Sequence, residues 1–425
     1  MKKIIILFLL CFFSFTVFSS EAESDINKAD EYFSQGKIHE AEEIYNKLCQ
    51  SSPTNYAAQL GHSRCALLMN HLGCAFRYGK NASDLKPSET EPRENMAVAY
   101  YRLGRFDKAS EIYSGLGRKV LIKKLNSFKG LEPYKIDSDE VRTTIKLETA
   151  EPFPVIKVSV NGDYEGLFIL DTGTPETVLD KNFAKRVKAD TFGKEKGTIF
   201  GKDNISFEHG KIDTIRIGGM TVSNIPVYTA DFSKLFRETS GSMKIEGILG
   251  YGFLSNFILY ASPLSGEISL RTVSTEDEYK SFSEEIDPAD YFTVPFFLTR
   301  GNEMVTGTRL NGELCVFFKV DLGQPGIGIS VEKNAVQESQ IEYDLTETTS
   351  QKVPVNISEG IAESLEFGEI KLNRIKVRIT DLGSIVNKYP FPINGVIGWE
   401  YFKSNETIFD FIGMRILVKK PNTDE

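Results

Sequence analysis

The chain reads LFILDTGT at residues 167–174, and a second version of this stretch, VFFKVDLGQ, stands at residues 316–324. In both versions an apolar run ends in an aspartate with a glycine two residues later, at Asp171 and at Asp321. The aspartates are 150 residues apart, and the same offset relates Asn161-Gly162 to Asn311-Gly312. We interpret the C-terminal two-thirds of the chain as two copies of one unit, each offering one carboxylate from the end of a strand.

A third pair of blocks supports the duplication. Gly247-Ile248-Leu249-Gly250 corresponds to Gly395-Val396-Ile397-Gly398, at an offset of 148 residues. Within each copy, short runs with the two-residue period of a β-strand are separated by glycine-rich turns, which is typical of all-β, barrel-like lobes. We predict a first lobe over residues 140–273 and a second over 290–422. The acidic, polar segment from Ser274 to Asp290 is expected to link them.

The region before these copies has a helical pattern. Small and aromatic residues recur at intervals of three and four, and Ala41, Ala75 and Ala109 are spaced 34 residues apart. This layout resembles the tetratricopeptide repeat (TPR), a helix-turn-helix unit of about 34 residues. The resemblance implies a TPR-like domain over residues 23–130. Two roles stay open for it: a concave surface that binds a peptide or partner protein, or a structural module beside the β region.

Composition excludes some classes of protein. The 425 residues carry a net charge of −9 with both signs interspersed, whereas a nucleic-acid-binding protein would show a basic face. The four histidines, at positions 39, 62, 71 and 209, have no metal-ligand spacing, so no metal site is expected.

The first residues have the pattern of a targeting segment. Lys2 and Lys3 precede an apolar run, Ile4 to Phe18, and small residues follow it. This pattern is typical of a secretory signal peptide over residues 1–22, so we expect an exported protein, periplasmic or extracellular. An uncleaved membrane anchor is an alternative, although the apolar run is short for a bilayer span. A lipoprotein signal at Cys11 is disfavoured by the large Leu10 before it.

Four cysteines would remain after cleavage, at positions 49, 65, 74 and 315. An exported protein can pair its cysteines, and three of these lie close together in the helical region. One local disulfide and small buried thiols are both compatible with this spacing, because connectivity cannot be derived from sequence.

The stretch from Asp171 to Leu179 resembles the active-site segment of retropepsin-like and pepsin-like aspartic proteases. Ile248-Leu249-Gly250 and Val396-Ile397-Gly398 are similar to the hydrophobic-hydrophobic-glycine element of that family, which packs beside the catalytic loop. The resemblance implies a multidomain protein: an α-helical TPR-like domain followed by an all-β, two-lobed aspartic-protease-like domain.

The resemblance also implies roles for individual residues. Asp171 and Asp321 would form the catalytic pair, and Gly173 and Gly323 would allow close backbone approach. Thr172 would lock its loop to the partner loop through its hydroxyl, and Thr174 would hydrogen-bond the outer oxygen of Asp171. Hairpins at Thr198–Gly210 and Thr346–Gly360 are the candidate flaps over a substrate.

The chemistry of two adjoining carboxyls fits the same interpretation. Ionising both would place two negative charges side by side, which is unfavourable, so they share one proton. The ionised carboxyl can activate a water, and the protonated one can donate to a peptide carbonyl. Such a site needs no metal and no cofactor, and its substrate would be a peptide or protein.

The second copy departs from the family pattern. Leu322 has no hydroxyl for an inter-lobe clasp, and Gln324 stands where a small hydroxyl or alanine is expected. Three hypotheses follow: an aspartic endopeptidase, a catalytically inactive pseudo-protease that binds peptides, and an enzyme whose lobes pair between molecules. Pairing within one chain is simpler, because the second lobe is already tethered.

Overall fold

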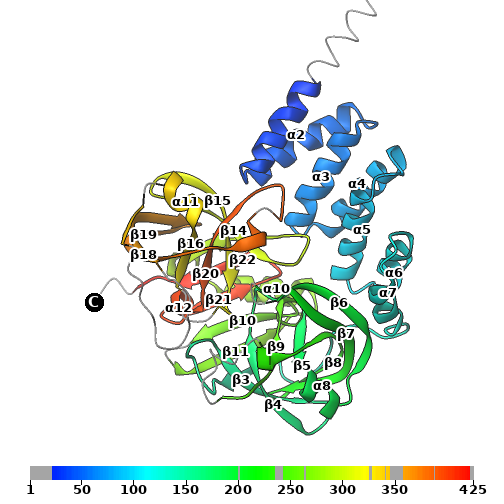
Figure 1. Ribbon diagram of the computed structural model, residues 1–425, viewed down its shortest axis with the longest axis vertical. Helices are drawn as coiled ribbons and strands as arrows, with labels where there is room; N and C mark the ends of the chain where they lie inside the picture. Colours follow the sequence, from blue (N-terminus) through cyan, green and yellow to red (C-terminus); the bar gives the residue numbers. More distant parts are fainter. Residues whose placement is uncertain are drawn as a thin grey trace, which may run out of the picture. The chain divides into compact units, whose positions relative to one another are not determined.

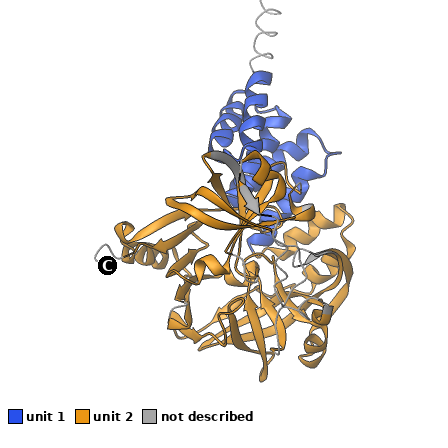
Figure 2. Cartoon of the chain, turned by 60° about the vertical axis from the view of Figure 1, so that its left-hand side comes forward, with its two compact units in different colours: residues 1–103 blue, residues 104–425 orange. Residues whose placement is uncertain are grey.

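The structure is a computed structural model that describes residues 22–199, 202–234, 243–262, 265–324, 328–339, 341–344, 358–386 and 388–421. The chain divides into two compact units, residues 1–103 and 104–425, coloured separately in Figure 2. The first is helical and the second is built mainly of strands, as the sequence predicts. The signal-peptide prediction lies outside the described residues, except for Ala22.

The first unit consists of helices stacked in sequence order (Figure 1). They are residues 22–34, α2 (Ile38–Ser51), α3 (Tyr56–Leu68), α4 (Leu72–Leu85) and α5 (Glu91–Arg102). Small residues allow the close helix contacts: Ala41 and Ala75 are fully buried, and a Cβ on Gly61 would lie 2.4 Å from the Tyr45 ring. Cys49, Cys65 and Cys74 are free thiols, and the side chain of Cys315 lies outside the description. Among the described residues, no helix is long and apolar enough to cross a membrane.

Two further helices, α6 (Phe106–Gly115) and α7 (Lys119–Asn126), belong to the second unit. Helix α7 lies against strands β6 and β7 of the first lobe. The expected helical span of residues 23–130 therefore runs across the division after Leu103.

The first lobe is one eight-stranded sheet in the order β1-β8-β5-β9-β4-β3-β7-β6, and the extra pairing of β8 with β7 closes it into a barrel. Its strands are β1 (Lys135–Asp137), β3 (Val155–Val160), β4 (Tyr164–Leu170), β5 (Thr177–Asp180), β6 (Asp190–Ile199), β7 (Lys202–Ile217), β8 (Met220–Ala230) and β9 (Ile245–Leu249). Short helices α8 (Lys181–Arg186) and α9 (Tyr251–Leu254) follow β5 and β9, and the 3-10 turn η1 (Phe232–Lys234) follows β8.

The second lobe repeats this arrangement. Its sheet order is β13-β14-β15-β20-β16-β19-β18-β17, closed by pairing of β14 with β18. The strands are β13 (Phe297–Leu298), β14 (Met304–Leu310), β15 (Glu313–Asp321), β16 (Ile329–Glu332), β17 (Glu342–Asp344), β18 (Ser358–Phe367), β19 (Ile370–Thr380) and β20 (Ile393–Gly398). Helices α11 (Lys333–Glu338) and α12 (Trp399–Phe402) correspond to α8 and α9, and the 3-10 turn η4 is Gly383–Ile385. The predicted duplication is thus present in the strand topology.

A six-stranded sheet joins the lobes. Its order is β12-β22-β21-β10-β11-β2, with β2 (Arg142–Lys146), β10 (Phe257–Ser262) and β11 (Glu267–Thr272) from the first lobe. The second contributes β12 (Tyr291–Pro295), β21 (Thr407–Asp410) and β22 (Arg415–Lys419). Strands β10 and β21 pair antiparallel at the centre, so the two lobes share a backbone hydrogen-bond ladder.

The segment expected to link the lobes contains regular secondary structure. It contains α10 (Glu276–Glu285) and a 3-10 turn, η3 (Pro288–Asp290). Thr275 caps α10, and Phe282 on that helix is fully buried against the joining sheet. The acidic composition of the segment concealed this helix from the sequence analysis.

Candidate active site

Each candidate aspartate stands at the end of a central strand of its lobe. Asp171 follows β4, which pairs in parallel with β9 through Ile169–Ile248 and Leu170–Leu249. Asp321 ends β15, which pairs in parallel with β20 through Val320–Ile397 and Asp321–Gly398. The predicted hydrophobic-glycine elements are therefore the strands directly beside the aspartates. Ile248, Leu249 and Ile397 are fully buried, and Val396 nearly so.

The glycine that ends each of these elements lets the next turn pack tightly. A Cβ on Gly250 would lie 2.2 Å from the carbonyl oxygen of Glu176, which is closer than van der Waals contact allows. In the second lobe the backbone N–H of Gly398 donates to the carbonyl of Gly328 at 2.8 Å. Both loops are thus supported by backbone of the neighbouring strand.

The two aspartate loops meet face to face within one chain. A Cβ on Gly173 would lie 2.2 Å from Asp321 Oδ2, and a Cβ on Gly323 would lie 2.3 Å from Asp171 Cγ. Each carboxyl therefore rests on the glycine of the opposite loop, where any other residue would collide with it. The predicted site residues Asp171, Asp321, Gly173 and Gly323 are brought together.

Backbone donors hold both carboxyls. The N–H of Gly173 donates to Asp171 Oδ1 at 2.6 Å, and the N–H of Gly323 donates to Asp321 Oδ1 at 3.0 Å. In the first loop the Thr174 hydroxyl also donates to Asp171 Oδ2 at 2.6 Å, as the resemblance implied. Asp171 and Asp321 are 2% and 7% exposed, so the pair is nearly removed from water.

Comparison with known proteins agrees with this geometry. Residues 156–253 match the family model described as aspartyl protease, and residues 23–55 match that of the tetratricopeptide repeat.

The chain contains a domain that is similar to aspartyl proteases.

The match runs from β3 to α9 and includes Asp171 and the Ile248–Gly250 element. The second lobe lies beyond the matched residues and repeats the closed six-stranded part of the first, with β14, β15, β20, β16, β19 and β18 in the places of β3, β4, β9, β5, β8 and β7. No curated protein matches the chain.

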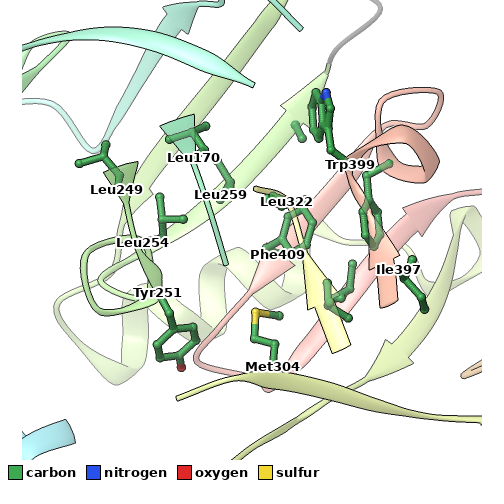
Figure 3. Close-up of a cluster of buried hydrophobic side chains, with 14 of the residues drawn as sticks. Leu170, Leu249, Tyr251, Leu254, Leu259, Met304, Leu322, Ile397, Trp399 and Phe409 are labelled. Atoms are coloured by element: carbon green, nitrogen blue, oxygen red, sulfur yellow. The ribbon is translucent and has the colours of Figure 1, made fainter. Parts of the chain in front are cut away.

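The clasp between the loops of the protease domain is one-sided. Thr172 Oγ1 donates to the carbonyl of Val320 at 3.0 Å and accepts from the N–H of Leu322 at 3.2 Å. Leu322 makes no reciprocal bond because leucine has no hydroxyl, and its side chain is buried in the core instead. Figure 3 draws it among Leu170, Leu259 and Phe409, which come from both lobes.

The electrostatics of the pair favour a shared proton. Burial raises the pKa of Asp171 to about 7, and the charge of Asp321 and a hydrogen bond between the carboxyls add to the rise. Lys319 and the Thr174 hydroxyl oppose it. Around neutral pH and below, the pair therefore keeps a proton.

Two charged residues at this site were missed by the sequence analysis. Lys319 Nζ lies 3.0 Å from Asp321 Oδ2, and the Lys319 side chain is only 13% exposed. Glu303 is 8% exposed and interacts electrostatically with Lys319. A lysine in the apolar run that ends at Asp321 was the available signal, since side chains two apart on a strand share a face.

A buried ion pair fastens the first active-site loop to α7. Lys124 pairs with Glu176, which follows the Asp171 motif, and both side chains are 4% exposed or less. The ammonium also lies 4.6 Å from the centre of the Tyr228 ring. Burial lowers the pKa of Lys124, against the opposing effect of Glu176. This pair joins residues 52 apart, a separation that no periodicity reveals.

The candidate flaps are only partly described. In the first lobe, β6 and β7 form a long hairpin that includes most of Thr198–Gly210, while residues 200 and 201 lie outside the description. Phe207 packs against Tyr228, with ring centres 4.8 Å apart. Of the second candidate, Thr346–Gly360, only residues 358–360 are described, in β18. Among the described residues, no cluster of three or more histidine, cysteine or acidic side chains could hold a metal ion.

Proposed function

We propose that this protein is an exported aspartic endopeptidase whose catalytic pair is Asp171 and Asp321. The observation that carries the proposal is the mutual packing of the two carboxyls, each against the glycine of the opposite loop. The aspartyl-protease match of residues 156–253 supports the reaction class. Export is proposed from the signal-like residues 1–22 alone.

The proposed reaction is peptide-bond hydrolysis by an activated water. The ionised carboxyl takes a proton from water, whose oxygen forms a bond to the peptide carbonyl carbon, while the protonated carboxyl gives its proton to the carbonyl oxygen. The C–N bond then breaks as the nitrogen receives the proton taken from the water, and one hydroxyl of the intermediate returns its proton to the second carboxyl as the C=O bond re-forms. One water is consumed, and a carboxylic acid and an amine are released. No metal or cofactor takes part in this proposal.

Cleavage of a diverse peptide mixture by the mature protein between pH 3 and pH 8 tests the proposal. Wild type is expected to cut, and Asp171→Asn is expected to be silent while remaining folded. Asp163→Asn is the matched control, because the Asp163 side chain is fully exposed in a hairpin turn. Equal cleavage by wild type and Asp171→Asn would show that the Asp171/Asp321 pair is not the catalytic pair.

The second candidate is a pseudo-protease that binds peptides without cutting them. It is favoured by Leu322 and Gln324, which replace the hydroxyl residues of the first loop. Leu322→Thr combined with Gln324→Ser restores the missing groups. Cleavage gained only by this double variant, with peptide binding already present in wild type, would favour the pseudo-protease over the enzyme.

We propose that the TPR-like region contributes a binding surface for a peptide or protein partner. The match of residues 23–55 to the tetratricopeptide repeat supports this role. Binding of candidate peptides to wild type, measured by calorimetry with and without an active-site competitor, separates this surface from the protease cleft.

A further inference from the structure

Lys319 holds an unusual place beside the pair. It stands two residues before Asp321 on β15, so both side chains project from the same side of the strand. Its Nζ lies 3.0 Å from Asp321 Oδ2, while Asp321 Oδ1 accepts the N–H of Gly323. Both oxygens of Asp321 therefore have a donor, and one of the donors is a positive charge.

The duplication supplies an internal reference for this position. In the first lobe the corresponding residue is Ile169, which is fully buried in an apolar cluster together with Phe153. The residue that corresponds to Phe153 is Glu303. A lysine and a glutamate thus replace an isoleucine and a phenylalanine at equivalent sites of one fold.

Stability alone gives little reason for this exchange. Taking two charges out of water is expensive, and well-packed apolar residues at such sites are commonly as stabilising or more so. The first lobe is built with the apolar version. The charged version therefore points to a role at the carboxyls.

The two loops also differ in the donor on the second carboxyl oxygen. The neutral hydroxyl of Thr174 donates to Asp171 Oδ2, whereas Lys319 donates to Asp321 Oδ2. Gln324 stands at the position that corresponds to Thr174. A charged donor favours the ionised form of a carboxyl more strongly than a neutral donor does.

We propose that Lys319 is a positioning residue that holds Asp321 as the ionised member of the pair, so that the shared proton resides on Asp171. The consequence of this charge assignment for catalysis rests on the proposed function. Asp321 would then take the proton from water, and Asp171 would give its proton to the carbonyl oxygen of the peptide.

The charged groups around Lys319 are consistent with a permanently charged ammonium. Asp321 lies on its own strand, Glu303 lies just before β14, and Asp171 follows β4. Burial alone would lower the pKa of Lys319, but Asp321 and Glu303, and after them Asp171, raise it above its ordinary value. A proton on Asp171 leaves the two larger contributions, from Asp321 and Glu303, in place.

Glu303 is in turn held in its ionised form. Although burial opposes it, Lys319 and Lys388 lower the pKa of this carboxyl. Lys388 Nζ lies 3.1 Å from Glu303 Oε1, and the Tyr389 hydroxyl and the Thr299 hydroxyl donate to Oε2. Glu303 therefore adds a second negative charge that acts on the Lys319 ammonium.

Carboxyl ¹³C NMR titration of aspartate-labelled protein tests the proposal without reference to activity. Asp171→Asn and Asp321→Asn assign the two signals. In Lys319→Met the first proton should leave the pair at a pH higher by about one unit or more than in wild type. Lys319→Arg should restore the wild-type titration, and the surface variant Lys371→Met should leave it unchanged.

A second variant protects the test against simple misfolding. Lys319→Ile combined with Glu303→Phe installs the residues of the first lobe, so the protein should fold while the titration still moves upward. An unmoved titration in a folded Lys319→Met or double variant would overturn the proposal.

The pH dependence of kcat/KM separates this inference from the proposed function. If the protein cleaves peptides, the acidic limb of its profile should move upward in Lys319→Met by the shift seen in the NMR titration. The NMR shift without cleavage by wild type would keep the charge assignment and reject the endopeptidase. Cleavage by wild type, with neither the pH profile nor the NMR titration shifted in Lys319→Met, would keep the endopeptidase and reject the charge assignment.

Discussion

The two lobes of the protease domain share a strand order and differ in the side chains around their aspartates. Both loops hold their carboxyl by the N–H of the glycine two residues on, a contact that needs no particular side chain. Around this common frame the first lobe has Thr172, Thr174 and an apolar cluster. The second has Leu322, Gln324 and a largely buried lysine, Lys319. Backbone donors therefore preserve the geometry of the aspartate pair, while the side chains give its two members different surroundings.

The largest effect on stability is expected at the ion pair beneath the first loop. Lys124→Met leaves Glu176 buried without its ammonium, which should lower the free energy of unfolding by about 3–5 kcal/mol. Lys181→Met is the control, because the Lys181 side chain is half-exposed, its partner Asp231 is 23% exposed, and such solvated pairs contribute about 0–1 kcal/mol. Urea denaturation of both variants measures the difference. Equal losses would mean that the buried pair is not what fastens α7 to the loop.

The close approach of the loops predicts the next effect. Gly323→Ala places a methyl group against Asp171, which should cost about 1–3 kcal/mol of stability and displace the carboxyl. Gly328→Ala in the same lobe is the control, since its Cβ would lie 3.7 Å from the nearest atom. Thermal unfolding and cleavage rate are the measurements. A Gly323→Ala variant as active and stable as the control would contradict the packing of the two loops.

The one-sided clasp predicts unequal responses at equivalent positions. Thr172→Val removes the hydroxyl and leaves the N–H of Leu322 and the carbonyl of Val320 without that partner, at a cost of about 1–3 kcal/mol. Leu322→Met keeps an apolar side chain of similar volume and should cost less than about 1.5 kcal/mol. Denaturant midpoints compare the two. A costlier Leu322→Met would show that the core contact, and not the hydroxyl, joins the loops.

Measured over any single pH unit, the smallest effect is a pH dependence of stability. Because the folded-state pKa of Asp171 is raised from 3.8 to about 7, the folded protein binds this proton more readily than the unfolded chain. Stability from this group should fall as pH rises from 4 to 7, on the order of 1 kcal/mol per pH unit. Asp171→Asn should remove that dependence, as seen in urea midpoints at several pH values. Parallel curves for wild type and variant would indicate an unperturbed carboxyl.

The sequence was informative where the duplication repeats a residue at a fixed offset. Asp171 and Asp321, the glycines after them, and the Ile248–Gly250 and Val396–Gly398 elements all lie where the repeated blocks suggest. The topology of the lobes and the helical repeats could be predicted for the same reason.

The remainder depends on contacts that a linear pattern does not contain. Lys124 and Glu176 meet only because the barrel brings α7 beside the loop. Lys319 stands two residues before Asp321, so strand alternation could have placed both on one face, but the contact of its Nζ with Asp321 Oδ2 is known only from the fold. Helix α10 was concealed by its acidic composition, although its buried Phe282 stabilises it.

In the proposed endopeptidase the two lobes contribute one carboxyl each to a single reaction. Steady-state cleavage of one susceptible peptide by Asp171→Asn, Asp321→Asn and the double variant tests it most directly. Each single variant is expected to lose activity on the order of 10³-fold and the double variant to be no worse, because the carboxyls act as a unit. Wild-type activity in Asp321→Asn would contradict it.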